Sequence, residues 1–362
     1  MTKVLVVDDS ALTRKHLQEV LSDEGFVVAT ASNGQECLER IPQYQPDVIT
    51  LDINMPVMDG LTCLRSIMNS NPTPVVMISS LTEKGARASF EALELGAVDY
   101  IPKPGSKTTT HSLMQPYVGE SANTLFAKLR SAARVNVLQA NNAKATSPEA
   151  RKQPELRFER HNTVAICKRP SAEIELVLVG VSTGGPGTLK EIITRLPSEF
   201  PVPIVIAQHM PSRFTSVFAE RLNGISRVAV SEVSHISELK PGNVYIAKGD
   251  ADITIVRRGN RLYADSIPAD ENILWHPSVD ALVSSATNVI PPSKVLCVQL
   301  TGMGDDGAAS MTLAHEKGAT TIAESEDTAV VFGMPRELIS RGAADKILPN
   351  YDIAQAIIES IY

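Results

Sequence analysis

The 362-residue sequence has no long hydrophobic run and no surplus of basic residues. No apolar segment approaches the length that a membrane-spanning helix needs, and the first one, Val4–Val7, stops at two aspartates. We therefore expect no signal peptide, a cytoplasmic location and no insertion into a membrane. A formal net charge of -7 also argues against electrostatic binding of nucleic acid, which needs concentrated Lys and Arg.

Paired cysteines are missing as well. The four cysteines stand far apart and form no C-x-x-C pair, so we expect reduced, packed thiols rather than disulfides or metal ligands. Hydrophobic residues make up 43% of the chain and charged residues 21%, which is ordinary for a globular protein. A chain of this length and composition is sufficient for two or three domains.

Strand-like and helix-like stretches alternate in the first third of the chain. The expected buried strands, all short and rich in β-branched residues, are Lys3–Val7, Asp47–Asp52, Val75–Ser79 and Val98–Ile101. Helices are expected at Ala11–Leu21 and Glu83–Leu95, with a glycine beyond the end of each. This alternation predicts a parallel sheet with helices on both faces.

The pattern changes after about residue 121. Leu125–Leu138 is compatible with one amphipathic helix, and the polar residues that follow it are typical of a linker. The alternation of strands and helices resumes near Ala172, and Gly242–Ala247, Asp252–Arg257 and Arg261–Asp265 predict a β-hairpin region. We therefore expect an α/β protein with a doubly wound domain over 1–122, a helix and flexible linker over 123–171, and a second doubly wound α/β domain over 172–362 with a β-hairpin insertion.

Polar side chains stand at the carboxyl ends of the strands expected in the first third. Asp8 and Asp9 follow one strand, Asp52 ends another, and Ser79 and Lys103 mark the ends of two more. Because these ends meet at one edge of a parallel sheet, the five side chains can share one crevice. Three carboxylates favour a hard cation such as Mg²⁺, and a lysine beside them suits a transferable phosphoryl group. Any single acid here could be a helix cap, but the whole set at these spacings predicts a site.

Three strands expected in the second half each run into a residue that acyl chemistry uses. Ser182 follows Glu175–Gly180, His209 follows Pro203–Gln208, and two aspartates lie beyond Lys294–Leu300. A serine nucleophile, a histidine base and a carboxylate that orients the histidine are the minimum for nucleophilic acyl transfer. The G-x-S-x-G spacing around Ser182 supports an exposed nucleophile, although such a turn could also bind a phosphate. The chain order serine, histidine, acid disfavours the α/β-hydrolase fold.

Position alone does not select the carboxylate. The candidates near strand ends are Asp250, Asp252, Asp305 and Asp306. The choice of base is clearer, because His209 directly follows an apolar strand, whereas His235 and His276 stand in less regular surroundings.

The N-terminal motifs resemble the receiver domain of two-component response regulators. The residues that carry the resemblance are Val7–Ser10, Leu51–Gly60, Lys103 and Pro104. The resemblance implies a flavodoxin-like fold in which Asp52 accepts a phosphoryl group from a chemotaxis histidine kinase.

The same resemblance implies roles for the side chains around Asp52. Mg²⁺ would be held by Asp8, Asp9, Asp52 and the main chain of Asn54. Lys103 would pair with the phosphoryl oxygens, Ser79 and Tyr100 would be the switch positions, and the peptide before Pro104 would be cis. Asn54 departs from the acidic residue often found at this place. Since only its main chain need touch the metal, we expect an altered phosphoryl lifetime rather than lost function.

The second half resembles the catalytic domain of the chemotaxis protein-glutamate methylesterase family. The motifs that carry this resemblance are Ser182–Pro186, Gln208–Pro211, His276–Asp280, Leu300–Gly307 and Val331–Pro335. The resemblance implies that Ser182 is the nucleophile, His209 the base and then the acid, and Asp306 the carboxylate that orients His209. Thr183 and the main chain at Met303 would support the oxyanion. The segment Ala247–Asp252 lacks the Pro and His expected there, so the resemblance does not predict the details of the substrate-facing loop.

This resemblance also implies an activity and its partners. The enzyme would remove methyl groups from glutamate methyl esters of methyl-accepting chemoreceptors and deamidate receptor glutamines, with no cofactor for the esterase reaction. The unphosphorylated receiver would cover the catalytic crevice, and the protein would be peripheral to receptor arrays. One alternative is the same enzyme in a chemosensory array unrelated to swimming. Another is a receiver with a non-enzymatic docking output, which is weak because the second half is not basic and shows no helix-turn-helix pattern.

Overall fold

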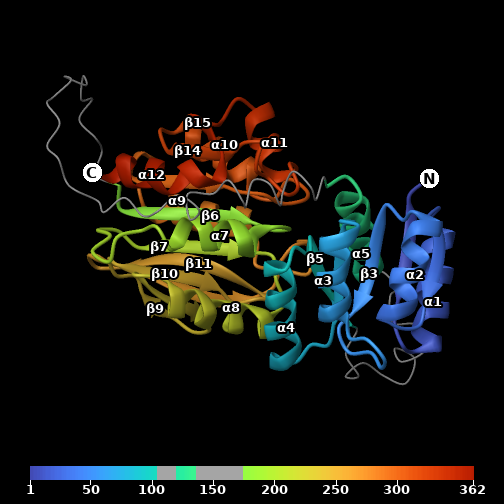
Figure 1. Cartoon of the computed structure of the whole chain (residues 1–362). Coiled ribbons are helices and arrows are strands. Elements are labelled where there is room, and N and C mark those ends of the chain that lie inside the picture. The colour runs from blue at the N-terminus through green and yellow to red at the C-terminus, as the bar shows by residue number, and fades with distance from the viewer. Residues whose placement is uncertain (104–119, 136–173) are drawn as a thin grey trace, which may run out of the picture.

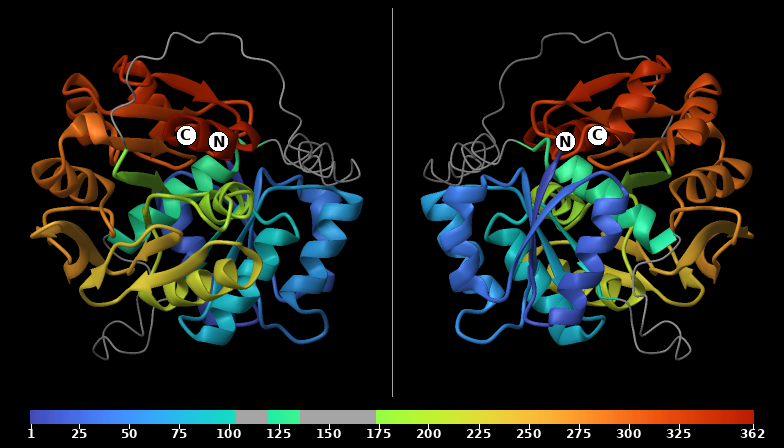
Figure 2. Two further views of the ribbon diagram at one scale, coloured as in Figure 1. Left: turned by 90° about the vertical axis from the view of Figure 1, so that its left-hand side faces the viewer. Right: turned by 90° about the vertical axis from the view of Figure 1, so that its right-hand side faces the viewer.

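The computed structural model describes residues 1–103, 120–135 and 174–362, and they form two α/β units that lie side by side (Figures 1 and 2). The first unit comprises residues 1–103 and 120–135, and its five strands are ordered β2-β1-β3-β4-β5. The second unit comprises residues 174–362, and its main sheet has seven strands in the order β15-β14-β13-β6-β7-β10-β8. Neighbouring strands in both sheets are parallel. The expected α/β class and the order of the two units are confirmed.

The first unit alternates strands and helices along the chain. Its elements are β1 (Lys3–Val7), α1 (Ala11–Asp23), β2 (Val27–Ala31), α2 (Gly34–Tyr44), β3 (Val48–Asp52), α3 (Gly60–Ser70), β4 (Val75–Ser79), α4 (Glu83–Glu94), β5 (Asp99–Pro102) and α5 (Glu120–Ala132). The side chains of Ser10, Asn33, Asp59 and Thr82 accept hydrogen bonds from the first turns of the four helices that follow them. These caps explain where each helix begins, because they satisfy amide groups that lack a partner within the helix.

The structure adds one strand to those that the sequence predicts in this unit. β2 lies at the edge of the sheet, pairs only with β1 among the described strands, and is mostly not buried. The predicted strands of the centre are continuous runs of buried apolar residues, as parallel strands covered on both faces should be. β2 lacks that pattern because one of its edges has no neighbouring strand in the described part of the chain.

Helix α5 packs on the first sheet. Its residues Leu125, Phe126, Leu129 and Ala132 are buried in a cluster with Val4, Val6 and Ile78 of the strands. The domain boundary predicted at residue 122 therefore falls inside α5, and we place the whole helix with the first unit. The predicted linker beyond residue 135 and the peptide before Pro104 lie outside the described residues.

The second unit repeats the same architecture on a larger scale. Its elements are β6 (Leu176–Val181), α7 (Gly185–Ile193), β7 (Ile204–Gln208), α8 (Ser212–Ile225), β8 (Ala229–Val233), β9 (Ser237–Glu238), β10 (Asn243–Ala247), β11 (Ala251–Arg258), β12 (Arg261–Pro268), α9 (Val279–Val289), the 3₁₀ turn η2 (Pro292–Lys294), β13 (Val295–Gln299), α10 (Ala308–Glu316), β14 (Thr320–Glu324), α11 (Met334–Ser340), β15 (Lys346–Leu348) and α12 (Asn350–Ile361). No helix within the described ranges is both long and apolar enough to cross a membrane.

The predicted hairpin region is only partly right. β11 and β12 form the expected antiparallel hairpin, and β9 joins them in a three-stranded sheet. The prediction is wrong for Gly242–Ala247: this segment forms β10, which pairs in parallel with β7 and β8 in the main sheet. Its residues from Val244 onward are all buried, which is the pattern of a parallel strand rather than of a half-exposed hairpin.

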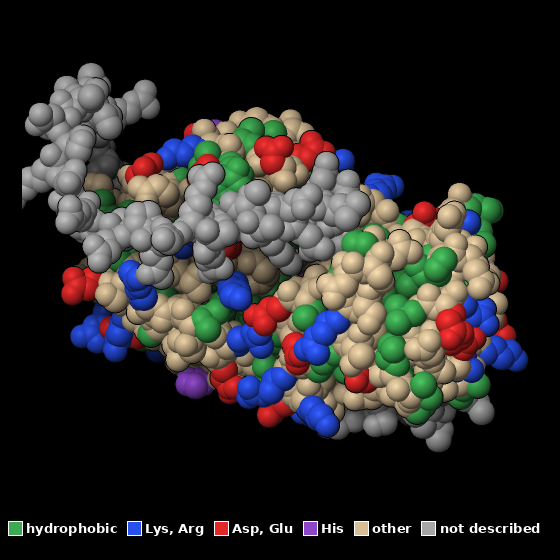
Figure 3. All heavy atoms as spheres, viewed as in Figure 1, with side chains coloured by type: hydrophobic (Ala, Val, Ile, Leu, Met, Phe, Trp, Pro, Cys, Tyr) green, Lys and Arg blue, Asp and Glu red, His purple; other side chains and the backbone are tan. Residues whose placement is uncertain are grey.

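The two units meet where α4 of the first lies against α7 and α8 of the second (Figure 1). The Phe90 ring stacks on Phe218 with 5.4 Å between centroids, and Tyr100 stacks on Phe214 with 4.4 Å between centroids. These four aromatic residues are buried and form the core of what we call the α4–α8 interface. Figure 3 shows acidic and basic side chains gathered where the two units meet. Arg87 of α4 and Glu220 of α8 form an ion pair of 3.1 Å across the interface.

The packing of α5 leads to a first prediction. Leu129→Ala should lower the free energy of unfolding by about 2 to 5 kcal/mol, because it removes a fully buried side chain and leaves a cavity. Hydrogen exchange in urea at the amides of β1 and β4 measures the effect in the full-length protein. Asn123→Ala, at an exposed position of the same helix, is the control and should change the stability by less than about 0.5 kcal/mol. Equal protection in the two variants would show that α5 is not part of this core.

Candidate functional site

Three neighbouring strands of the second sheet bring the predicted catalytic residues to one edge. β6 lies between β13 and β7, and the three strands are parallel. Ser182 directly follows β6, His209 directly follows β7, and Asp306 lies in the loop after β13. Main-chain bonds lock the register beyond the strands, from His209 N to Val181 O at 3.1 Å and from Ser182 N to Thr301 O at 2.9 Å. This is the carboxyl edge of the sheet, where ligands of α/β proteins bind.

His209 and Asp306 form a buried pair. His209 Nε2 lies 2.8 Å from Asp306 Oδ2, and the two side chains are only 5% and 7% exposed. Asp306 Oδ2 also accepts the N–H of Val279 at 2.7 Å, and its Oδ1 accepts the N–H of Asp280 at 2.9 Å, both in the first turn of α9. Burial alone would raise the pKa of Asp306, but the bonds from His209 and from these amides bring it below its ordinary value.

The orientation of this pair leaves one imidazole nitrogen available. A carboxylate only accepts hydrogen bonds, so Nε2 carries the proton of a neutral His209 and Nδ1 carries the lone pair. Nδ1 is buried and has no hydrogen-bond partner among the described residues. Ser182, which is 6% exposed, is therefore not bonded to it in this arrangement. Such bonds are often long without substrate and tighten when it binds.

Only one of the four carboxylates considered from the sequence contacts His209. Asp250 accepts hydrogen bonds from the main chain and hydroxyl of Ser212, at 3.0 and 2.7 Å. Asp252 accepts a bond of 2.9 Å from His276 Nδ1, and Asp305 is exposed. The structure thus separates the candidates that position in the sequence left open.

Two glutamines hold the backbone of the site. Gln208 Nε2 donates to Ser182 O at 3.0 Å and to His209 O at 3.2 Å, and Gln299 Nε2 donates to Asp306 O at 2.9 Å. Both residues end apolar strands and are buried. The sequence prediction missed them, although a single amide at the end of a strand of Val, Ile and Leu is a usable signal, because a buried amide needs partners.

Thr183 follows Ser182 in the chain, and the loop that carries Met303 approaches Ser182 at Gly302. A Cβ at Gly302 would lie 2.8 Å from Ser182 Cβ, so only glycine lets the loop that carries Met303 approach the serine this closely. The Thr183 hydroxyl donates to Asp99 Oδ2 of the first unit at 2.7 Å. Asp99 also pairs with Lys128 of α5 at 2.9 Å. The residue next to the serine is therefore bonded directly to the other unit.

The buried carboxyl of Glu324, at the end of β14, holds the start of the loop that carries Met303. Glu324 Oε2 accepts the N–H of Thr301 at 2.8 Å, and its Oε1 accepts the Thr328 hydroxyl at 2.9 Å. Burial raises the pKa of Glu324 to about 7 despite these two bonds, which act in the opposite direction.

The first unit gathers the predicted acidic residues. Carboxylate oxygens of Asp8, Asp9 and Asp52 lie within 4.8 Å of one another, and Lys103 Nζ lies 2.8 Å from Asp52 Oδ2 and 3.0 Å from Asp8 Oδ2. Burial raises the pKa of Asp52, although Lys103 opposes this. Burial also disfavours the charged Lys103, but its bonds to Asp52 and Asp8 outweigh that and raise its pKa. Three carboxylates and a single ammonium fit a hard divalent cation with oxygen ligands.

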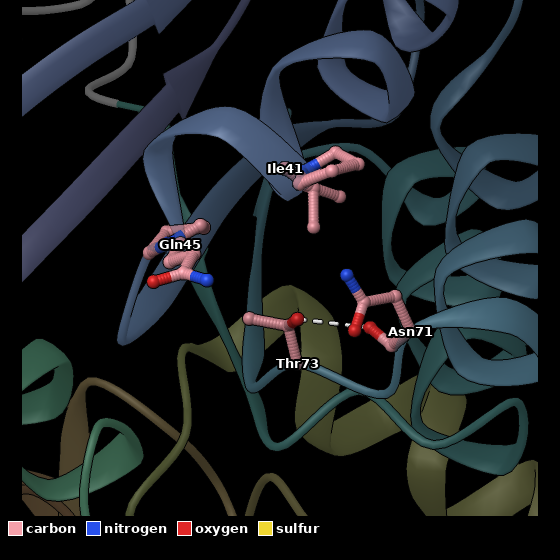
Figure 4. A pocket seen from close by; sticks show the side chains of 6 residues that line it. Ile41, Gln45, Asn71 and Thr73 are labelled. Carbon is pink, nitrogen blue, oxygen red and sulfur yellow. Dashed lines mark hydrogen bonds between the residues drawn. The ribbon is translucent and has the colours of Figure 1, made fainter.

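The main chain of Ser79 accepts the N–H of Lys103 at 2.6 Å, but the side chains of both predicted switch residues, Ser79 and Tyr100, interact elsewhere. The Ser79 hydroxyl is buried and donates to Gly85 O of α4 at 3.0 Å. Tyr100 is 4% exposed and lies in the α4–α8 interface, where burial raises the pKa of its hydroxyl well above the ordinary value. The side chain of Asn54 is exposed and lines a pocket that extends to Arg87 and to Arg221 of the second unit. Another pocket, lined by Ile41, Pro42, Gln45, Pro46, Asn71 and Thr73, lies at the opposite end of the strands and belongs to neither site (Figure 4).

Comparisons with known proteins cover both units. A family model described as CheB methylesterase matches residues 177–357, and one described as response regulator receiver domain matches residues 4–115. A protein-glutamate methylesterase/protein-glutamine glutaminase of Rhodospirillum rubrum is 47% identical over 98% of this chain and 95% of its own length. One of Carboxydothermus hydrogenoformans is 45% identical over 99% of both chains. The crystal structure of the Thermotoga maritima CheB methylesterase catalytic domain covers 51% of this chain and 98% of its own, with a TM-score of 0.50 and 40% identity.

The position of Glu324 yields a pH prediction. Its pKa is about 7 when folded against an ordinary value of 4.5, so its contribution to stability is full below pH 4.5 and is lost as the pH rises through 7. Relative to Glu324→Gln, the wild-type protein should lose about 3 kcal/mol of unfolding free energy between pH 4.5 and pH 8. Urea unfolding of both proteins at the two pH values measures this difference. The same pH dependence in both would contradict it.

Proposed function

This chain belongs to the CheB methylesterase family and carries a response regulator receiver domain, and from that premise we propose which residues perform and control its reaction. It is an enzyme that hydrolyses glutamate methyl esters in proteins and deamidates glutamines, and it acts in chemotaxis. The expected activity is confirmed, and a non-enzymatic docking output is not favoured. The residues, partners and domain limits that follow are our proposal.

Ester hydrolysis is assigned to Ser182, His209 and Asp306. Ser182 Oγ attacks the ester carbonyl while His209 Nδ1 takes the serine proton, and Asp306 holds the imidazolium that forms. The tetrahedral intermediate expels methanol, which leaves with that proton and gives an acyl-enzyme. Water then attacks the acyl-enzyme with His209 as base, releasing free glutamate and restoring Ser182. The observation that carries this assignment is the buried 2.8 Å bond from His209 to Asp306, which leaves Nδ1 as the proton acceptor.

The oxyanion of the tetrahedral intermediate needs donors placed beside Ser182. We assign this role to the main chain at Met303 and a supporting role to Thr183, because both adjoin the serine. Each preorganised donor of this kind raises kcat by a factor on the order of 10² to 10³. The Thr183 hydroxyl is bonded to Asp99 while the two units are in contact, so this support is incomplete in that arrangement.

The first unit is proposed to control this reaction through Asp52. Asp52 would accept a phosphoryl group from a chemotaxis histidine kinase, and the Lys103 ammonium would form an ion pair with the phosphoryl oxygens. Asp8, Asp9, Asp52 and the main chain of Asn54 would hold Mg²⁺. When bound, that ion would neutralise the charge that builds up on the transferred group. The contact of Lys103 with both Asp8 and Asp52 ties the state of this cluster to β5, whose Asp99 and Tyr100 contact the second unit.

Docking of the two units is proposed as the means of inhibition. The α4–α8 interface involves α7 and α8, the helices that follow Ser182 and His209 in the chain. Phosphorylation would weaken this docking and admit methyl-accepting chemoreceptors, with Ser79 and Tyr100 as the responding residues. We assign the protein to the cytoplasm, peripheral to receptor arrays, with a receiver near 1–122 extended by α5 and a catalytic domain near 172–362.

The chemistry and its control are tested together by methanol release from methyl-labelled receptor membranes. Release by the wild-type protein should rise when a small phosphodonor and Mg²⁺ are added. Ser182→Ala should lower it by about 10⁴-fold or more, since it removes the nucleophile. Asp52→Asn should keep the basal rate and lose the stimulation. Full release from Ser182→Ala would exclude the mechanism, and stimulation of Asp52→Asn would exclude the proposed control.

The inhibitory docking is tested by reversing one charge. Glu94 lies 3.1 Å from Lys190 and also pairs with Arg221, and these partners outweigh burial and lower its pKa. Glu94→Lys sets like charges against each other at a surface position, so basal methanol release without phosphodonor should rise about three- to tenfold. Glu39→Lys, on the exposed face of α2, is the matched control and should leave the basal rate unchanged. A basal rate that stays at the wild-type value in Glu94→Lys would argue against inhibition through this interface.

A further inference from the structure

The imidazole of His209 has an aromatic neighbour that the proposed mechanism does not use. Trp275, the only tryptophan of the chain, stacks on His209 with 5.4 Å between ring centroids and 7° between ring planes. It comes from the segment between β12 and α9. On the loop that carries Met303, a Cβ at Gly304 would lie 3.5 Å from the indole Nε1. The indole therefore adjoins both the proposed base and the proposed oxyanion loop.

We propose that Trp275 is a positioning residue of the esterase site, which fixes the plane of the His209 ring and so the direction of the Nδ1 lone pair. This inference rests on the role proposed above for His209. Asp306 holds the imidazole at Nε2 alone, and Nδ1 has no partner among the described residues. One hydrogen bond leaves the ring free to tilt, whereas a parallel ring against its face restricts that motion. Small errors in the placement of a base are costly for the rate.

Stacking also suits the charge that the reaction creates. His209 becomes an imidazolium when it takes the serine proton. The face of an indole carries negative potential and attracts a cation placed over it. The contact is therefore stronger in the transition state than in the resting enzyme, which is the condition for an interaction to raise kcat.

Hydrophobic burial does not account for this tryptophan. Trp275 is only half-buried, its neighbour Leu274 is 56% exposed, and Trp275 belongs to none of the hydrophobic clusters of the described residues. A tryptophan that fills a core would pack against the buried apolar side chains of one of these clusters. Its neighbours here are the imidazole and a loop with glycine at the point of contact.

Asp252 holds the Trp275 segment in place. This carboxylate, which is 3% exposed, accepts His276 Nδ1 at 2.9 Å and the Ser278 N–H at 2.8 Å through Oδ1. Its Oδ2 accepts the Asp270 N–H at 3.2 Å. Asp252 thus anchors the segment on both sides of Trp275 to β11. Asp252 belongs to the segment Ala247–Asp252, which departs from the expected family pattern. In the structure its carboxylate is hydrogen-bonded to His276.

The test uses the full-length protein with a small phosphodonor and Mg²⁺, and a fluorophosphonate probe in place of receptor. In this reaction Ser182 Oγ bonds to phosphorus, fluoride leaves with the electron pair of the P–F bond, and His209 takes the serine proton. Trp275→Ala should lower the maximal labelling rate by about 10- to 100-fold while the half-saturating probe concentration changes by less than about twofold. Trp275→Phe keeps a stacked ring and should recover most of the rate.

A spectroscopic measurement accompanies the kinetics. Because Trp275 is the only tryptophan, its fluorescence reports the stack directly. His209→Ala removes the imidazole and should change the emission intensity or maximum, whereas His235→Ala, at an exposed position between β8 and β9, should not. Circular dichroism confirms that the variants are folded.

Several results would overturn the proposal. Labelling of Trp275→Ala at the wild-type rate, equal losses in Trp275→Ala and Trp275→Phe, or emission that is unchanged in His209→Ala would each do so while leaving the proposed function intact. A folded wild-type protein that does not react with the probe would instead contradict the roles given to Ser182 and His209, and with them that of Trp275.

Discussion

The parallel pairing of β6 with β13 on one side and β7 on the other is the constraint on which the catalytic half depends. It sets the ends of three buried strands at the same edge, so that Ser182, His209 and the loop of Asp306 meet although the chain separates them widely. Strand ends that are locked by main-chain bonds leave little freedom to the residues that follow. Gln208 and Gln299 extend this rigidity, because their amides donate hydrogen bonds to the main-chain carbonyl groups of Ser182, His209 and Asp306.

The first unit applies the same rule to a different chemistry. Its parallel strands bring Asp8, Asp52 and Lys103 together at their carboxyl ends. β5 continues from this cluster to the other unit, since Asp99 bonds to Thr183 and Tyr100 stacks on Phe214. One strand, β5, and the α4–α8 interface thus connect the Asp52 cluster with the segment that carries Ser182. A displacement of Lys103 can therefore be transmitted through β5 to Asp99 and its hydrogen bond with Thr183.

Much of the fold was predictable from the sequence, because buried parallel strands are continuous apolar runs. The meeting of the candidate side chains at one edge was predictable too, because they follow these strands in the chain. The limits of the prediction have physical causes. β2 lies at an edge and lacks the apolar pattern. β10 directly precedes the hairpin strand β11 in the sequence, so proximity along the chain points to the wrong sheet. The choice of Asp306 over Asp252 needed the family resemblance, since both follow or begin strands. Trp275 could not be found, because a stacking contact between two loops has no sequence period.

Phosphorylation of Asp52 is proposed to release the α4–α8 interface and so to expose the carboxyl edge of the second sheet. Hydrogen–deuterium exchange of the full-length protein, with and without phosphodonor and Mg²⁺, measures that interface directly through the amides of α4 and α8. These amides should lose protection when phosphodonor is added to the wild-type protein and keep it in Asp52→Asn. Constant protection while esterase activity rises would exclude activation by undocking, because the two units would then still be docked in the active protein.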